Sequence, residues 1–447
     1  MKHLPLLFLL GTAPFWGALS ATGAGPWPAE SNTNAVRLTD VDPGLDTNNW
    51  SGAFWNPGTR TLWLACNNPG SFYALVEDGA GGFKIPTNAA GTPAKWFTVA
   101  SYDMEAICQA DLGQDIVYLM DENGYIREYD VSQYGVAVEN QNWDIRAQCP
   151  EVDSASGPEG LAFIPDEYLR RQGFCDTNGT PCTSSNGMGG LMFVGYQYDG
   201  CVYAFDLDRG NGQYGFVGRY KTGRAETADL EFDRATGRLF IWHNLDANYL
   251  EITELGSDPD GPDRRLRPLA EVAGPRAGNL EGFALVPSSS TNDAGGCILT
   301  DDDNLDREAV MWYRQFQPAA DTDADGLSDG WELWHFGSTT QTTGSADSDS
   351  DRLSNADEEI AGTDPTNAAS ALIQFAPLSQ AAGREVVLSW RSATGRTYAI
   401  DSAAPIESGF TNRVQARIGS TAPVNISTVD ISGAASGQFY RVVVEAP

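Results

Sequence analysis

Short apolar segments separated by tight turns dominate the first two thirds of the chain. Three such segments form a unit: an opening segment, a second segment, and a third that follows a turn rich in Asp, Asn or Gly. The second segments of successive units are residues 61–65, 116–120, 191–194, 238–242 and 297–299. Short runs rich in β-branched and aromatic residues, bounded by turn residues, predict β-strands.

The unit recurs with a nearly constant period. Its opening positions are Ser51, Glu105, Glu159, Ala228 and Glu281. These positions are 54, 54, 69 and 53 residues apart, and the longest interval contains an insertion around residues 175–182. A period of about 50 residues made of short strands is typical of β-propeller blades, and the alternative is a β-sandwich with coincidental spacing.

We therefore predict an all-β protein with a β-propeller over residues 32–318. Five units predict five blades, and a sixth, degenerate blade is the alternative. The last unit lacks an outer strand, which residues 35–38 can supply from the N-terminal side. That pairing closes the ring of blades and leaves no free sheet edge.

Three opening segments share a short motif: MEAI at 104–107, PEGLA at 158–162 and LEGFA at 280–284. These motifs resemble those of SdiA-regulated and phytase-like β-propellers, and the resemblance covers roughly residues 45–317. It implies a propeller with a central channel and, in the phytase branch, calcium-assisted hydrolysis of phosphate esters. This chain differs at Ser51 and Ala228, which lack the opening carboxylate, and its nearest basic candidates for holding phosphate are Arg224 and Arg276.

The blade geometry also gathers carboxylates at one end of the channel. In an antiparallel hairpin the start of the first strand lies beside the end of the second, so Glu105, Glu159, Glu281 and Asp301 share one rim. Further carboxylates follow the second strands, namely Asp121, Glu122, Asp199, Asp246, Asp302 and Asp303, and Glu226 and Asp229 flank the opening at Ala228. Crowded carboxylates repel one another unless a cation neutralises them, and an all-oxygen set favours calcium. We predict a divalent metal at this mouth, and the alternative is a hydrated acidic rim.

The composition becomes strongly acidic after residue 317. Residues 321–332 follow the calcium-loop spacing D-x-D-x-D-G-x-x-x-x-x-E, with Gly326 at the sharp turn. Calcium takes about six to eight oxygen ligands, and alternate side chains of such a loop converge on one ion. The predicted ligands are Asp321, Asp323, Asp325, the backbone carbonyl of Leu327, Asp329 and Glu332.

A second acidic loop begins 26 residues after the first. Its predicted ligands are Asp347, Asp349, Asp351, Leu353, Asn355 and Glu358. Arg352 stands where the first loop has glycine, which predicts strain and weaker binding. The two loops resemble bacterial thrombospondin type 3 repeats over residues 321–367, so we assign residues 319–370 to a linker that binds Ca²⁺. The alternative is a disordered acidic spacer.

The C-terminal residues 371–447 return to short strands, at 386–390, 397–400, 424–429 and 439–444. Their Gly- and Ser-containing turns predict a small β-sandwich. It resembles C-terminal modules of exported bacterial proteins, which implies a binding, anchoring or capping role.

The N-terminus has the order of a secretory signal peptide. A basic start precedes an apolar run over residues 4–19 and small residues at 20–24. We predict that residues 1–24 are removed, that the protein is secreted or held at the cell surface, and that the mature chain has no membrane span. In that oxidising setting Cys175 and Cys182, two of seven cysteines, are predicted to form a local disulfide.

The charge limits the classes of partner. The chain has 60 Asp and Glu against 28 Lys and Arg, a formal charge of −32, which disfavours nucleic acid and anionic membranes and suits calcium. Only His243 and His335 lie outside the predicted signal peptide, a weak basis for a His-dependent nucleophile. The sequence therefore identifies no catalytic residue.

The favoured prediction is an exported calcium-binding multidomain protein whose propeller is a platform for a protein, carbohydrate or small-molecule ligand. One alternative is a metal-dependent propeller hydrolase of phosphate esters or lactones, which also requires a basic group that holds the electrophile. The other is a structural or adhesion protein of the cell surface.

Overall fold

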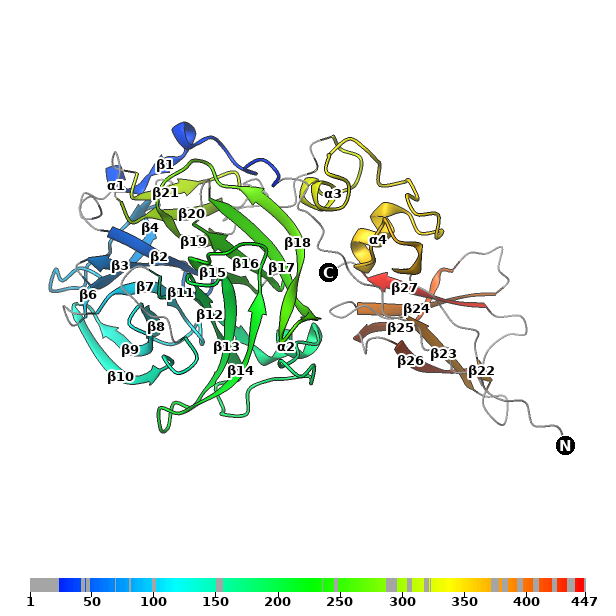
Figure 1. The fold of residues 1–447 in the computed structure, drawn as a ribbon, viewed down its shortest axis with the longest axis horizontal. Helices are drawn as coiled ribbons and strands as arrows, with labels where there is room; N and C mark the ends of the chain where they lie inside the picture. Colours follow the sequence, from blue (N-terminus) through cyan, green and yellow to red (C-terminus); the bar gives the residue numbers. More distant parts are fainter. Residues whose placement is uncertain are drawn as a thin grey trace.

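The computed structural model describes residues 24–41, 45, 49–68, 70–79, 82–98, 102–149, 156–234, 236–244, 248–286, 296–303, 308–316, 321, 323–370, 378–379, 385–391, 397–404, 410–419, 424–431 and 439–445. The predicted signal peptide lies outside the described residues except for Ala24. Figure 1 shows three parts: a large β body, a segment with two short helices and a small β module. None of the described helices is long and apolar enough to cross a bilayer.

Antiparallel strands of the large body follow the predicted repeat. The first unit contains β2 (Asn49–Asn56), β3 (Thr61–Asn68), β4 (Ser71–Glu77), β5 (Phe83–Lys84) and β6 (Lys95–Phe97). The second unit contains β7 (Met104–Cys108), β8 (Ile116–Asp121), β9 (Tyr125–Gln133) and β10 (Val136–Asp144). The third unit contains β11 (Pro158–Pro165), β12 (Gly190–Tyr196), β13 (Cys201–Leu207) and β14 (Tyr214–Lys221).

The remaining two units complete the body. The fourth contains β15 (Asp229–Asp233), β16 (Arg238–His243), β17 (Tyr249–Asp260) and β18 (Asp263–Ala273). The fifth contains β19 (Leu280–Val286), β20 (Gly296–Asp301), β21 (Val310–Tyr313) and, from the N-terminal side, β1 (Val36–Arg37). A short parallel pairing of β14 with β18 joins the third and fourth units into one eight-stranded sheet.

The first strands of the units contact one another in a closed cycle. β2 contacts β7, β7 contacts β11, β11 contacts β15, β15 contacts β19, and β19 contacts β2. The fold is therefore predominantly β and propeller-like. We call residues 24–316 the propeller-like body, and the five first strands the inner ring.

The N-terminal segment ties the end of the body to its beginning. Val36 and Arg37 pair antiparallel with Trp312 and Met311, so the predicted supply of an outer strand by residues 35–38 is confirmed. Earlier in the chain, the ring centroid of Trp27 lies 5.3 Å from that of Tyr313. These contacts bury apolar surface across a junction that would otherwise expose a strand edge.

Glycines follow the opening positions because the inner strands approach closely. A Cβ atom at Gly52 would lie 2.5 Å from the carbonyl oxygen of Glu105, and one at Gly282 would lie 2.5 Å from that of Ser51. Real Cβ contacts are longer than this, so a side chain at either position would push the inner ring apart. The glycine of the repeated motif is thus a packing requirement of the ring.

Asp229 occupies the equivalent position in the fourth unit. Its carboxylate accepts the backbone N–H groups of Leu230 and Phe283, each at 2.8 Å, and the backbone N–H groups of Ala53 and Leu161 also favour its ionised form. The side chain is 1% exposed. One carboxylate therefore bonds backbone groups of β15 and β19, and its burial raises its pKa well above the usual range although the nearby backbone N–H groups oppose that shift.

The predicted disulfide between Cys175 and Cys182 is wrong. None of the seven cysteines forms a disulfide in the structure. The loop closes through its backbone instead, since Cys182 N donates to Phe174 O and Asp176 N donates to Thr180 O. The Asp176 carboxylate also accepts the Thr180 N–H, the local hydrogen bond that lets an Asp close a turn without a covalent link.

Short helices lie outside the sheets of the body. They are η1 (Asn32–Asn34), α1 (Leu38–Val41), α2 (Asp166–Arg171), α3 (Asp329–Phe336), α4 (Asn355–Ala361) and η4 (Ala368–Ser370). α2 belongs to the insertion between β11 and β12, which accounts for the long interval of the repeat. α3 contacts β18 of the propeller-like body, so the acidic linker is docked on the fourth unit.

The C-terminal residues form two three-stranded sheets. One contains β22 (Leu378–Ser379), β23 (Glu385–Arg391) and β26 (Val424–Asp430), and the other β25 (Asn412–Gly419), β24 (Thr397–Ala403) and β27 (Phe439–Glu445). Trp390 and Val429 of the first sheet share a buried cluster with Tyr398 and Ile400 of the second. The two sheets thus have a common core.

Candidate metal sites

The first acidic loop brings its aspartates together. Carboxylate oxygens of Asp321, Asp323 and Asp325 lie within 4.8 Å of one another. The Asp321 carboxylate accepts the Gly326 N–H at 2.9 Å, and the Asp325 carboxylate accepts the Leu327 N–H at 3.0 Å. These bonds fold the backbone around the aspartates, as a calcium loop requires.

The last predicted ligand of this loop arrives on a helix. Glu332 lies in α3 and is fully buried. Asp329 begins the same helix, and its side chain lies outside the described part of the chain. The described geometry therefore gathers the aspartates at positions 1, 3 and 5 and places Glu332 on the element that follows them.

The second acidic loop repeats this arrangement and shows orphaned oxygens. Asp347, Asp349 and Asp351 have carboxylate oxygens within 4.8 Å of one another. Glu358 of α4 is fully buried, and its Oε2, like Oδ2 of Asp349 and of Asp351, has no hydrogen-bond partner. Burial first, then the charges of Asp349 and Asp351, raise the pKa of Glu358 to about 7. Inward-facing carboxylates without donors fit a divalent cation.

Asn355, another predicted ligand, has protein partners of its own. Its Nδ2 donates to Thr342 Oγ1 at 2.7 Å and to Thr343 O at 3.0 Å, and its Oδ1 accepts the Ser348 N–H at 3.4 Å. The side chain therefore holds the preceding turn against the loop. A role for Asn355 towards calcium, at a position that often acts through water, stays a prediction.

The two loops share an unusual backbone shape. Ala324 and Gly326 have φ angles of 59° and 95°, and Ser350 and Arg352 have 67° and 84°. Left-handed φ costs a non-glycine residue about 1–2 kcal/mol. The conformation is thus natural for Gly326 and strained for Arg352, which agrees with the predicted difference between the loops.

Arg352→Gly is expected to tighten calcium binding at the second loop by about three- to tenfold, because the folded loop loses strain of about 1 kcal/mol. Isothermal titration of the full chain measures this effect. The converse change, Gly326→Arg, is the matched control and is expected to weaken the first loop. An unchanged calcium affinity in both variants would show that the residue at the left-handed position does not affect the free energy of calcium binding.

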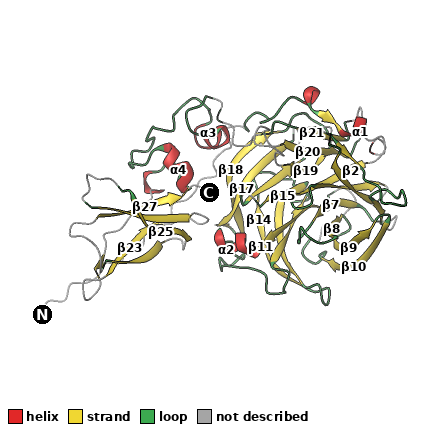
Figure 2. Cartoon of the chain, turned by 180° about the vertical axis from the view of Figure 1, so that it is seen from behind, coloured by secondary structure: helices red, strands yellow, loops and turns green. Residues whose placement is uncertain are grey.

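Hydrogen bonds also connect the two repeats. The Ser328 N–H donates to the Glu359 carboxylate at 3.4 Å, and the Gly344 N–H donates to Asp325 Oδ2 at 3.1 Å. Since α3 contacts β18 and α4 contacts β27, the pair of loops connects the propeller-like body with the C-terminal module (Figure 2). The acidic loops therefore contact both flanking parts.

A separate carboxylate cluster lies at one end of the inner ring, and β-bulges build it. Strand pairing slips by one residue at Glu105, Glu159 and Glu281, and a similar slip occurs at Ser51. The pairing of β15 with β16 is regular, and Ala228 stands at that opening. A bulge leaves one residue unpaired and re-aims its side chain. Every opening glutamate thus stands at a bulge, and the bulge of the first unit carries Ser51 instead.

The cluster, which we call the mouth, contains the predicted glutamates. Carboxylate oxygens of Asp103, Glu105 and Glu122 lie within 4.8 Å of one another. Glu159 and Glu281 are 6% and 8% exposed, and Oε2 of each has no hydrogen-bond partner. Burial, and then the charges of neighbouring carboxylates, raise the pKa of Glu105, Glu159 and Glu281 well above the usual range. This arrangement is costly without a cation and favourable with one.

Asp301, the fourth predicted mouth residue, has a different partner. Its carboxylate is fully buried and forms an ion pair with Arg276. The next residue, Asp302, faces the mouth instead: its pKa is raised to about 6 by burial and then by carboxylates that include Asp103. Side chains of successive residues at a strand end point to opposite sides. A shift of one position in the strand pairing would therefore exchange the residue that pairs with Arg276 and the residue that faces the mouth.

Asp103 is the mouth residue that the sequence interpretation missed. It lies two residues before Glu105, just outside β7, and burial raises its pKa. Its carboxylate oxygens lie within 4.8 Å of those of Glu105 and Glu122, a separation at which ionised carboxylates repel one another and a cation would relieve the repulsion. The sequence contained one signal for this role, namely an acidic residue two positions before the opening glutamate.

His243 has a structural environment. It is fully buried, with Nδ1 2.6 Å from Glu226 O and Nε2 3.1 Å from Glu251 Oε2. Both ring nitrogens thus have protein partners, which fits a hydrogen-bonded core histidine.

Comparisons with known proteins found similar solved structures and one matching family model. No curated protein matches the chain. Among solved structures, a periplasmic gluconolactonase from Pseudomonas aeruginosa is similar over 55% of this chain and 60% of its own, with 14% identity and a TM-score of 0.31. A nidogen–laminin complex (60% and 83%, 10% identity, TM-score 0.30) and a putative 6-phosphogluconolactonase from Bacteroides fragilis (50% and 55%, 12% identity, TM-score 0.30) are also similar.

A family match falls on the two acidic loops. Residues 321–338 and 347–368 match the family of the bacterial TSP3 repeat. The resemblance to bacterial thrombospondin type 3 repeats is thereby confirmed. The two loops that connect the propeller-like body with the C-terminal module thus carry the sequence of a calcium-binding repeat that is typical of extracellular bacterial proteins.

Proposed function

We propose that this protein is an exported calcium-binding protein whose body is a five-bladed propeller with a divalent cation at its mouth. In this proposal the propeller is a platform for a protein, carbohydrate or small-molecule ligand, and the C-terminal sheets form a sandwich module. The closed cycle of inner strands supports five blades. The motifs at the openings support a relationship with SdiA-regulated and phytase-like propellers.

One observation carries the cation at the mouth. Oε2 of Glu159 and Oε2 of Glu281 are buried without a hydrogen-bond partner, and both side chains belong to a group of mutually repelling carboxylates. A buried carboxylate oxygen without a donor loses its hydration and gains nothing in return. A calcium ion, which takes oxygen ligands with flexible geometry, would offset that cost for several carboxylates at once.

The same region offers less support for hydrolysis of phosphate esters. The two arginines expected to hold phosphate are already paired: Arg224 with Glu271 at 2.6 Å, and Arg276 with Asp301 and Glu308. A hydrolase would have to break these partly buried ion pairs before either guanidinium could hold a substrate. Binding of a cation at the mouth therefore does not by itself make the propeller a phosphatase.

Metal counting on the full chain tests the proposal. After gel filtration in calcium, the wild-type protein is expected to retain about three ions, two in the linker loops and one at the mouth. The triple variant Glu105→Gln, Glu159→Gln and Glu281→Gln keeps the side-chain shapes and removes the charges, so it is expected to lose one ion. Its melting temperature should also respond less to calcium than that of the wild type.

A matched triple variant of exposed carboxylates controls for net charge. Asp111→Asn, Glu167→Gln and Glu385→Gln lie on the surface, so the ion count should stay at the wild-type value. If the mouth variant keeps the wild-type count and the wild-type response of the melting temperature to calcium, the mouth does not bind a cation and the proposal fails.

A further inference from the structure

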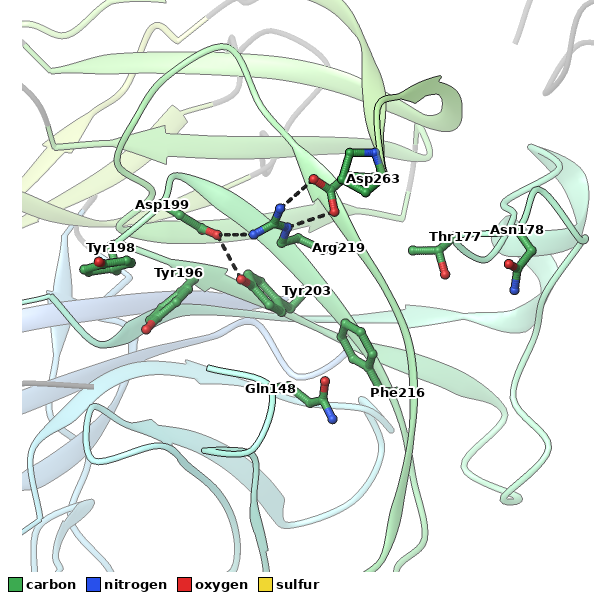
Figure 3. Close-up of a pocket in the computed structure, with 11 residues that line it drawn as sticks. Gln148, Thr177, Asn178, Tyr196, Tyr198, Asp199, Tyr203, Phe216, Arg219 and Asp263 are labelled. Atoms are coloured by element: carbon green, nitrogen blue, oxygen red, sulfur yellow. Dashed lines mark hydrogen bonds and ion pairs between the residues drawn. The ribbon is translucent and has the colours of Figure 1, made fainter. Parts of the chain in front are cut away.

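A pocket of about 490 Å³ opens on the side of the third unit and shares no residue with the mouth. Figure 3 shows aromatic side chains on one side, an arginine between two aspartates above them, and Thr177 across the opening. The walls come from the turn between β12 and β13, from β14, from the start of β18 and from the insertion loop. The volume lies within the range of small-molecule sites, about 300–1,000 Å³.

The polar groups of this side pocket are fixed in place. Arg219 donates through Nε and Nη2 to the two carboxylate oxygens of Asp263, at 3.0 and 2.5 Å, and through Nη1 to Asp199 Oδ2 at 3.2 Å. The Tyr203 hydroxyl donates to the same Asp199 oxygen at 2.9 Å. One cation between two carboxylates leaves no net positive charge, while planar hydrogen-bonding groups remain at the opening.

The aromatic side chains of the side pocket are exposed in a way that is uncommon for the body. Tyr198 is 53% exposed and Phe216 is 40% exposed. Tyr196 supports Tyr198 at a centroid distance of 5.9 Å, and Tyr203 supports Phe216 at 6.1 Å. Packing against Tyr196 and Tyr203 thus fixes the exposed rings of Tyr198 and Phe216 beside hydrogen-bonding groups that are already in place.

We propose that the side pocket binds a neutral carbohydrate. A sugar ring offers an apolar C–H face that packs on Tyr198 or Phe216 and hydroxyl groups that both donate to carboxylates and accept from a guanidinium. An anionic ligand would meet a site without net positive charge on a chain of formal charge −32. A cationic ligand would have to displace Arg219 from its two carboxylate partners.

An array of neutral, sialylated and sulfated oligosaccharides, probed with the full-length protein, tests this site. We expect saturable binding of a neutral oligosaccharide, which isothermal titration then quantifies. Tyr198→Ala and Phe216→Ala are each expected to weaken its binding by about tenfold or more, because exposed aromatic anchors carry much of the energy of such contacts. Arg219→Lys should weaken it as well, since Lys cannot keep the planar contacts with both aspartates.

Phe97→Ala is the matched control, because Phe97 is 58% exposed on β6 and lies outside the side pocket. It should bind as the wild type does. The melting temperature of each variant is measured alongside, so that a loss of binding is read only from folded protein, and two independent aromatic variants guard against one that fails to fold. Absence of any neutral ligand on the array, a preference for charged glycans alone, or equal affinity of the wild type, Tyr198→Ala and Phe216→Ala would overturn the proposal.

Discussion

Asp229→Ala is expected to destabilise the propeller-like body by about 3 kcal/mol, because the buried N–H groups of Leu230 and Phe283 lose their common acceptor. The wild-type carboxylate is 1% exposed and accepts hydrogen bonds from β15 and β19. Scanning calorimetry should show the melting transition of the body lowered by about 5 °C or more.

Two variants separate this role from a general effect of losing an aspartate. Asp229→Asn keeps the shape but turns an NH₂ group towards N–H donors, so its loss should approach that of Asp229→Ala. Asp233→Ala, at the other end of β15, removes hydrogen bonds to Thr236 in an exposed turn and should cost less than about 1 kcal/mol. Equal melting temperatures of Asp229→Ala and Asp233→Ala would contradict the central role of Asp229.

Removing calcium with EDTA is expected to unfold residues 321–370 and to leave the propeller-like body folded. Among the described side chains of this segment, the buried apolar ones are Leu327, Trp331, Ala361 and Pro365. So small an apolar core cannot offset the repulsion between two sets of converging aspartates. Hydrogen exchange should show protection of the segment in calcium and its loss in EDTA, while the strands of the body keep theirs.

Magnesium is the control for this experiment. It demands a tighter octahedral shell and keeps its waters, so it should not restore protection at the concentration at which calcium does. Equal protection of residues 321–370 with and without calcium would mean that the protein alone orders the linker.

The effect of calcium should also grow with pH. Burial and neighbouring aspartates raise the pKa of Glu358 to about 7 and raise that of Asp349 as well. A raised carboxyl pKa means that the calcium-free fold takes up protons more readily than the unfolded chain, so it loses stability as the pH rises through about 7. Calcium requires the ionised carboxylates, so its stabilising effect should be largest above pH 7 and should fall as the pH decreases towards 5.

Local spacing was sufficient for the linker loops. All predicted ligands of one loop lie within twelve residues, and the turn that gathers them is made by the same residues. The convergence of Asp321, Asp323 and Asp325 therefore needed no information from the rest of the chain. Even the weak point at Arg352 was visible, because only glycine adopts its left-handed φ without strain.

The mouth shows where sequence reasoning reached its limit. The repeat predicted that Glu105, Glu159 and Glu281 share a rim, but the side on which Asp301 and Asp302 lie depends on where the pairing of β19 with β20 slips. Asp103 joined the cluster because the backbone pairing continues one residue beyond β7 and β8, where Glu122 N donates to Asp103 O at 2.9 Å, a contact that the repeat did not predict.

The sequence by itself determined the strand period and the two acidic loops, since both rest on spacing along the chain, and it indicated the outer strand from the N-terminal side because the last unit lacked one. Only the tertiary structure decided that Asp229 bonds both β15 and β19, that Cys175 and Cys182 stay unlinked, and that Arg219 sits between Asp199 and Asp263. The physical reason is that the last three depend on the register of segments far apart in the chain or on a choice between competing local contacts, where a shift of one residue sends a side chain to the opposite face.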